Sequence, residues 1–193
     1  MRIRLFSRLV LLLAVIQLLL VLLSWLLSAM MVEGVRSLLS SEGLRWFLGS
    51  FASMLATPWL VWLLLLSMAG GCLWRSGLAA KPHTYRDRTA LRAALVLMAV
   101  YVAFVLVLTA APHAILLSAT GRLFPSPFSR ALVPLVAFGI ILVSSVYGRS
   151  SGRFSSFSDI VDSLSFGIAK AGPLFVAYVM LIQLYESLRF VCF

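Results

Sequence analysis

Residues 9–32 read LVLLLAVIQLLLVLLSWLLSAMMV, a run of 24 uncharged residues between Arg8 and Glu33. A membrane-spanning helix needs about 20 consecutive apolar residues, so this stretch is long enough to cross a bilayer. A secretory signal peptide also follows basic residues, but its apolar region is only about 7–15 residues long. We therefore expect residues 9–32 to form a retained membrane helix.

The composition of the whole chain supports a lipid environment. The 193 residues are 62 % hydrophobic and only 11 % charged, whereas a soluble domain has about 45–50 % apolar and about 25 % charged residues. A chain of this length accommodates at most about six or seven spans with short loops. We therefore expect a single transmembrane domain over residues 1–193, without a sizeable soluble part.

Four further apolar runs predict the remaining spans. The last of them has only 15 uncharged residues, between Lys170 and Glu186. The long side chains of these two residues can reach the membrane surface even when their backbone lies within the span. The predicted fold is all-α, an integral membrane bundle of about five helices. The expected spans after the first are residues 52–74, 92–111, 131–148 and 168–190.

An amphipathic segment precedes the second span. Leu44, Leu48 and Phe51 are spaced three and four residues apart, which places them on one face of a helix. This spacing predicts an interfacial or re-entrant helix over about 41–51, with Ser40 or Ser41 as its N-cap. Pro58 then interrupts the helix.

The distribution of positive charge predicts the orientation in the membrane. With five spans and a cytoplasmic N-terminus, eleven of the sixteen Lys and Arg residues fall on the cytoplasmic side, as the positive-inside rule requires. We expect a multi-pass protein of a bacterial inner membrane. The same rule accounts for the net charge of +10, and no basic patch alternates with base-stacking aromatic residues, so we expect no nucleic-acid partner.

The sequence contains no pattern typical of an enzyme, a metal site or a cofactor site. It has no nucleophile elbow, HExxH motif or phosphate-binding loop. His83 and His113 are far apart and have no carboxylate neighbours. Cys72 and Cys192 lie in apolar runs and are interpreted as small apolar residues.

Polar and helix-breaking residues in the spans are the candidates for a substrate path. Gln17 is interpreted as a packing residue that bonds a neighbouring helix. Gln183 is more informative because Tyr178 is close to it on the same span. Pro58 and Pro173 interrupt two membrane segments, which is typical of transporter binding sites, although membrane helices also tolerate proline for other reasons.

Two blocks of the sequence have a family pattern. The first is VRSLLSSEGLRWFL at 35–48, which continues through Pro58 to RSGL at 75–78. The second comprises VYGR at 146–149, DIVD at 159–162 and the last span with Gln183. Both resemble the p-aminobenzoyl-glutamate transporter (AbgT) family, and Gln183 matches a polar path residue of that family.

The resemblance implies a membrane transporter for p-aminobenzoyl-glutamate or related folate fragments, with sulfonamide efflux as a further activity, working as a homodimer. Typical members are longer and have two hairpins and a transport core for which this chain has no counterpart. A second hypothesis is therefore a non-transporting scaffold or accessory subunit derived from that fold. A partner chain would then supply the missing core.

Overall fold

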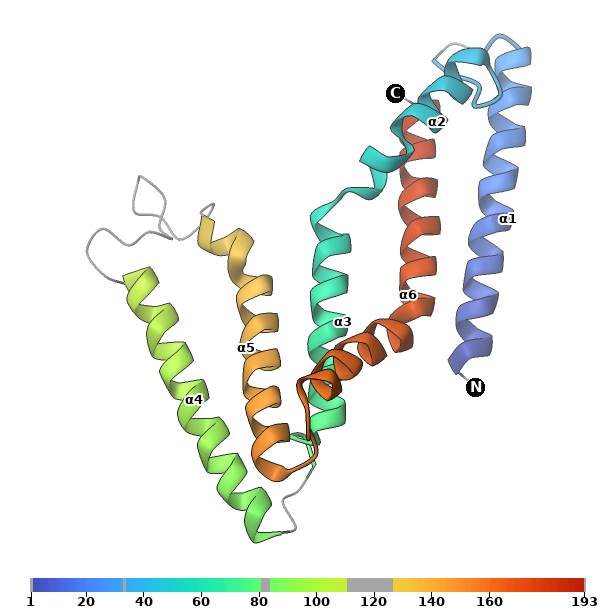
Figure 1. Cartoon of the computed structure of the whole chain (residues 1–193). Helices are drawn as coiled ribbons and strands as arrows, with labels where there is room; N and C mark the ends of the chain where they lie inside the picture. Colours follow the sequence, from blue (N-terminus) through green and yellow to red (C-terminus); the bar gives the residue numbers. More distant parts are fainter. Residues whose placement is uncertain (1, 33, 81–83, 111–126, 193) are drawn as a thin grey trace. The chain divides into compact units, whose positions relative to one another are not determined.

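The computed structural model of the chain describes residues 2–32, 34–80, 84–110 and 127–192. Within these ranges the chain forms six α-helices and no strand, which confirms the all-α fold class. The helices are α1 (Arg2–Ala29), α2 (Ser41–Leu55), α3 (Pro58–Ser76), α4 (Tyr85–Ala110), α5 (Pro127–Ser151) and α6 (Phe157–Cys192) (Figure 1). Lys81, His83, Pro112 and His113 lie outside the described residues.

All of these helices except α2 are long and apolar enough to cross a membrane, which gives five candidate spans among the described residues. Their large apolar side chains point outwards: Leu11 is 66 % exposed, Leu18 61 % and Val107 63 %. Exposing such surface to water costs about 25 cal/mol per Å², whereas lipid tails are as apolar as leucine. The helices therefore contact the lipid bilayer, and the chain is a multi-pass membrane protein.

The prolines act differently in the two interrupted segments. Pro58 is the first residue of α3, a position at which the missing N–H group of proline would have no intrahelical partner anyway. Pro173 instead lies inside α6. The span predicted at 168–190 is thus part of a longer helix that begins at Phe157.

The chain packs as two compact units, so that α3 and α6 each contribute residues to both. Unit 1 comprises Met1–Val61 and Ala171–Phe193, and unit 2 comprises Trp62–Lys170. The expectation of a single transmembrane domain remains a prediction.

In unit 1, α1 runs beside the C-terminal part of α6 (Figure 1). Gln17 Nε2 on α1 donates a hydrogen bond of 2.9 Å to Ser187 Oγ on α6, which is the packing role predicted for Gln17. Trp46 of α2 stacks on Phe190 of α6, with 4.3 Å between the ring centroids. Both α1 and α2 are therefore held against the same end of α6.

The beginning of α2 follows the sequence pattern. Ser40 is the N-cap, and its side chain accepts a hydrogen bond of 3.0 Å from the N–H of Gly43. The predicted apolar stripe is left largely uncovered, since Leu44, Leu48 and Phe51 are all exposed. This stripe is available for contact with lipid.

In unit 2, α4 and α5 pack through a small core. Ala90 and Ala94 of α4 meet Val143 and Tyr147 of α5, and all four are buried. Small residues on one helix allow close approach of the other in a membrane, where dispersion rather than the hydrophobic effect holds helices together.

The crossing of α3 and the first part of α6 is closer still, because glycine faces glycine. A Cβ atom on Gly71 would lie 2.5 Å from Gly167 Cα, and one on Gly167 would lie 2.9 Å from Gly71 Cα. Ser163 of α6 is fully buried in the same contact. The two backbones therefore touch at a point where no larger residue fits.

At one end of unit 2, two arginines donate hydrogen bonds to carbonyl groups at the C-terminal ends of helices. Arg153 Nη1 donates 2.7 Å to the carbonyl oxygen of Ser76, the last residue of α3. Arg86 Nε donates 3.1 Å to the carbonyl oxygen of Ser150 near the end of α5. Cations are favoured at helix C-termini, where carbonyl groups lack intrahelical donors.

Candidate functional site

The backbone between α2 and α3 is not helical at Ala56 and Thr57, which we term the α2–α3 break. The N–H of Ala56 donates 3.1 Å to the carbonyl oxygen of Ala52, and the N–H of Thr57 donates 2.8 Å to that of Leu55. Non-helical backbone at membrane depth is tolerated only where other groups satisfy it. The break directly precedes the candidate span that begins at Pro58, so partners from elsewhere in the chain would allow it to enter the membrane.

The hydroxyl of Tyr178, on α6, is such a partner. It donates 3.2 Å to the carbonyl oxygen of Leu55 and lies 2.5 Å from Thr57 Oγ1. Because a tyrosine carries a single O–H donor, the hydroxyl of Thr57 donates in the second bond. A polar node consisting of the Leu55 carbonyl and the Thr57 and Tyr178 hydroxyls thus joins the break to α6.

This polar node is uncharged, which limits its chemistry. Hydroxyl groups both donate and accept hydrogen bonds and can rotate to suit a partner, so the node can exchange its internal bonds for bonds to a polar ligand. Among the described residues, no group of three His, Cys, Asp or Glu side chains is placed to hold a metal ion.

Gln183 lies on a different side of α6. At about 100° per residue, Gln183 is about 140° around the helix from Tyr178 and only about 40° from Ser187. Ser187 bonds Gln17 of α1. The structure therefore places Gln183 on the side that faces α1, and does not bring it to the α2–α3 break.

The two predicted prolines lie near the node and near the unit boundaries. Pro58 directly follows the break, and Pro173 precedes Tyr178 by five residues on α6. Each proline is three residues from a boundary between the units, at 61/62 in α3 and at 170/171 in α6. The two helices that contribute residues to both units, α3 and α6, thus each carry a proline close to the unit boundary.

We expect Gln17→Leu to change the free energy of unfolding by less than about 1 kcal/mol. Hydrogen bonds between membrane helices are worth about 0.6 kcal/mol on average. Among the residues that the structure describes, the buried Gln17 Oε1 has no hydrogen-bond partner, so leucine also removes an unsatisfied acceptor. Thermal unfolding in mild detergent should show a shift within roughly 3 °C for a chain of this size. A fall of more than about 8 °C would contradict the packing role.

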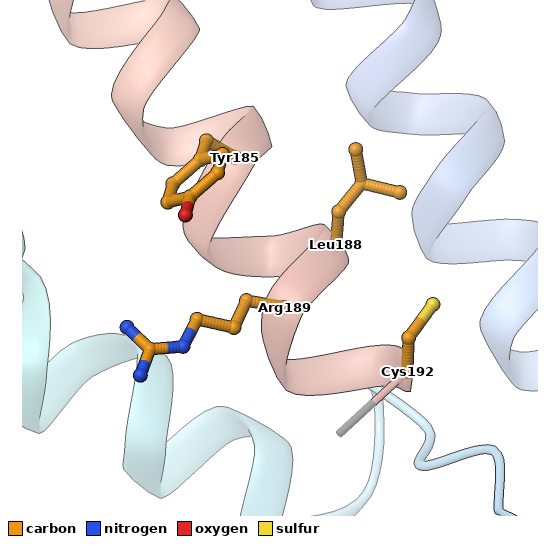
Figure 2. A pocket seen from close by; sticks show the side chains of 4 residues that line it. All are labelled: Tyr185, Leu188, Arg189 and Cys192. Atoms are coloured by element: carbon orange, nitrogen blue, oxygen red, sulfur yellow. The ribbon is translucent and has the colours of Figure 1, made fainter.

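A shallow depression of about 520 Å³ near the end of α6 is a weaker candidate site. It is lined by Tyr185, Leu188, Arg189 and Cys192. Figure 2 shows Leu188 and Cys192 on the side of α6 nearer α1, whereas Arg189 points away from α1. Arg189 Nη1 lies 4.0 Å from Glu186 Oε2, three residues earlier on α6. The depression has no buried polar group and carries no further argument.

Comparison with known proteins gives one match. A family model described as the AbgT putative transporter family matches residues 75–190, more than half of the 193-residue chain. The chain belongs to this family. No curated protein and no solved structure matches this AbgT-family chain. The family description is that of a transporter, which fits the expectation that the chain is not an enzyme.

The matched region of the AbgT-family chain contains only part of the candidate site. Pro173, Tyr178 and Gln183 lie within residues 75–190, whereas Pro58 and Thr57 precede them. Of the two blocks that resemble the family, the second lies inside the match and most of the first lies before it. The polar node therefore joins a residue of the matched region to a segment outside it.

Proposed function

We propose that this AbgT-family chain moves p-aminobenzoyl-glutamate or a related folate fragment across a bacterial inner membrane, with sulfonamides as a second substrate class. Membership of a transporter family supports the general role. The observation that carries the proposal is the helix break at Ala56 and Thr57, which is joined to α6 by Tyr178. Interrupted helices with free polar groups form the binding sites of many transporters.

In this proposal the substrate passes the polar node. Pro58 is a path residue because it directly follows the α2–α3 break. Pro173 is one because, inside α6, its missing N–H leaves a carbonyl group of the preceding turn without its intrahelical donor. A substrate amide or carboxylate would exchange bonds with the hydroxyls of Thr57 and Tyr178 as it passes. Gln183 marks an alternative path, along the side of α6 that faces α1.

We further propose that the N-terminus is cytoplasmic, together with the end of unit 2 that carries Arg86 and Arg153, which we term the basic end. Lys170 Nζ lies 3.5 Å from the ring centroid of Trp74, in the last turn of α3. Tryptophan and lysine side chains together are typical of the membrane–water interface. On this basis the part of α6 that precedes Lys170, which carries Asp159 and Asp162, lies at the cytoplasmic surface, and the span begins close to residue 168.

One observation favours the alternative, a non-transporting accessory subunit. The long apolar run within each candidate span, 171–185 in α6, contains no Asp, Glu, Lys, Arg or His among the residues that the structure describes, although such residues usually mark ion or proton pathways. A separate partner chain would then supply the coupling groups, whereas the proposed transporter would work as a homodimer. Purification in mild detergent, followed by mass determination of the intact complex, distinguishes the two assemblies.

The proposal is tested by flux into proteoliposomes that contain the purified full chain. We expect saturable uptake of radiolabelled p-aminobenzoyl-glutamate above that of protein-free vesicles, stimulated by unlabelled compound on the opposite side. A monodisperse, helical preparation without flux would contradict the proposal. Co-purification of a larger membrane chain from the same preparation would then support the accessory role.

The Gln183→Ala variant tests along which side of α6 the substrate passes. Because Gln183 faces α1 rather than the polar node, we expect the rate of uptake to change less than about twofold, which corresponds to about 0.4 kcal/mol. The rate is measured in the proteoliposomes described above, with equal amounts of folded protein. A loss of tenfold or more, about 1.4 kcal/mol, would instead place the path on the side of α6 that faces α1.

A further inference from the structure

A cavity of about 320 Å³ lies in unit 2 where α3, α4 and α5 meet. Apolar side chains form its accessible wall, among them Leu73, Met98 and Val136, and Ser144 also lines it. An apolar cavity about half this size stays dry and binds a hydrocarbon such as benzene. The cavity is therefore suited to a hydrocarbon chain rather than to water or an ion.

The cavity adjoins the surface that contacts lipid. Met98 is 51 % exposed, Val102 45 % and Val136 49 %, and all three belong to candidate membrane spans. In a bilayer, acyl chains surround the outward flanks of such helices. The hydrocarbon chains available to this cavity are thus the tails of membrane lipids.

Ser144 gives the cavity a polar feature. Its side chain is fully buried, and in the described part of the chain its Oγ has no hydrogen-bond partner. Its neighbour Ser145, by contrast, donates 2.7 Å to the carbonyl oxygen of Ile141. Buried hydroxyls are nearly always bonded. The accessible cavity wall is apolar, so the Ser144 hydroxyl would bond an acceptor on a ligand, such as an ester carbonyl, after rotation of its side chain.

Positive charge lies at the Leu78 end of the cavity. Leu78 lines it, and two residues earlier the carbonyl oxygen of Ser76 accepts a bond from Arg153. Arg86 lies against the turn that follows α5: a Cβ atom added to Gly152 would be 2.9 Å from its guanidinium carbon. Within the described residues neither arginine takes part in an ion pair. In the part of the chain that the structure describes, this positive charge therefore has no carboxylate partner.

The spacing along α5 agrees with the dimensions of a lipid. At 1.5 Å per residue, Ser144 is about 7 Å from Arg149 at the basic end, and Val136 is about 12 Å further into the span. Half the hydrocarbon thickness of a bilayer is about 15 Å. A tail that starts beside Ser144 and passes Val136 thus runs from the interface towards the midplane.

We propose that the cavity binds one acyl chain of an anionic phospholipid from the surrounding bilayer. The ester region lies beside Ser144, and the phosphate lies beside Arg86 and Arg153, in line with the affinity of basic pockets between membrane helices for anionic headgroups. The bound lipid fills the space between α3, α4 and α5. This proposal rests on unit 2 alone and does not depend on the transport activity.

Photolabelling tests the proposal in the full chain in nanodiscs. The probe is phosphatidylglycerol with a diazirine in one acyl chain, and labelled peptides are mapped by mass spectrometry. We expect adducts to concentrate at residues 98–102 and 136–144. Val136→Trp fills the cavity and should lower this labelling at least fivefold, whereas the matched control Phe138→Trp, on the exposed surface of the same helix, should not.

The headgroup contact is tested by changing the charge of the probe. A phosphatidylcholine probe with the same tail should label the cavity at least threefold less, and Arg86→Gln combined with Arg153→Gln should remove this difference. Excess inorganic phosphate should not compete, because the tail supplies much of the affinity. Labelling that is uniform over all exposed helix faces, or that is unchanged by Val136→Trp in a protein of normal helicity, would overturn the proposal. Equal labelling by both probes would overturn its headgroup part.

Discussion

Replacing either Gly71 or Gly167 by alanine is expected to destabilise unit 2 by about 1–3 kcal/mol, the usual cost of overpacking. An added Cβ at either position would lie closer than 3.0 Å to backbone atoms of the opposite helix. Backbone cannot move aside as the tip of a flexible side chain can, so α3 and α6 must separate. For a chain of this size the melting temperature should fall by roughly 2–4 °C for each kcal/mol lost.

Gly70 and Gly172 are matched controls for this experiment. Both are helical, and an added Cβ meets no atom within 4 Å at either position. Gly70→Ala and Gly172→Ala should therefore leave stability unchanged or raise it by about 0.5–1 kcal/mol, because alanine favours the helix over glycine. Equal melting temperatures for Gly71→Ala and Gly70→Ala in mild detergent would show that the close crossing is absent in the membrane protein.

Tyr178→Phe is expected to have the largest effect on flux. Phenylalanine keeps the ring but removes the hydroxyl that bonds Leu55 and Thr57. The Leu55 carbonyl retains the N–H of Thr57 as a donor, so stability should fall by only about 1 kcal/mol. A free-energy change of about 1 kcal/mol alters an equilibrium constant about fivefold. We therefore expect uptake of p-aminobenzoyl-glutamate to fall by about that factor.

Tyr185→Phe is the control for the loss of a hydroxyl. Tyr185 is on the same helix and is 57 % exposed, so its hydroxyl has no part in the polar node. This variant should match the original chain in both melting temperature and uptake rate. If Tyr178→Phe and Tyr185→Phe were equally active, the polar node would have no role in transport, although it could still brace the α2–α3 break.

Local features of the fold can be predicted from the sequence because they depend on neighbouring residues. Ser40 caps α2, as a serine before an amphipathic run does, and Pro58 starts α3. The five candidate spans follow from long apolar runs. The length of α6 is less predictable, because Pro173 does not end the helix when neighbouring groups can satisfy the freed backbone.

The candidate site could be predicted only in part. Pro58 stands beside the α2–α3 break, and a threonine before a proline at a helix start is a recognisable N-cap pattern that would have identified Thr57. No local signal pairs Thr57 with Tyr178, which is 121 residues away. The same applies to Gly71 and Gly167, whose contact depends on how α3 and α6 cross. An ordinary apolar run does not specify which of its faces will meet another helix.

Cysteine labelling tests whether the helices cross the membrane with the basic turns of unit 2 in the cytoplasm. One variant carries Cys72→Ser and keeps Cys192, which is exposed at the end of α6. A second carries Cys72→Ser, Cys192→Ser and Ser150→Cys, at an exposed position near the end of α5. In intact spheroplasts a membrane-impermeant maleimide should label Cys192 at once and the cysteine at position 150 only after the membrane is opened. Labelling of both positions from the same side would show that α6 does not cross the bilayer, and would contradict the proposed topology.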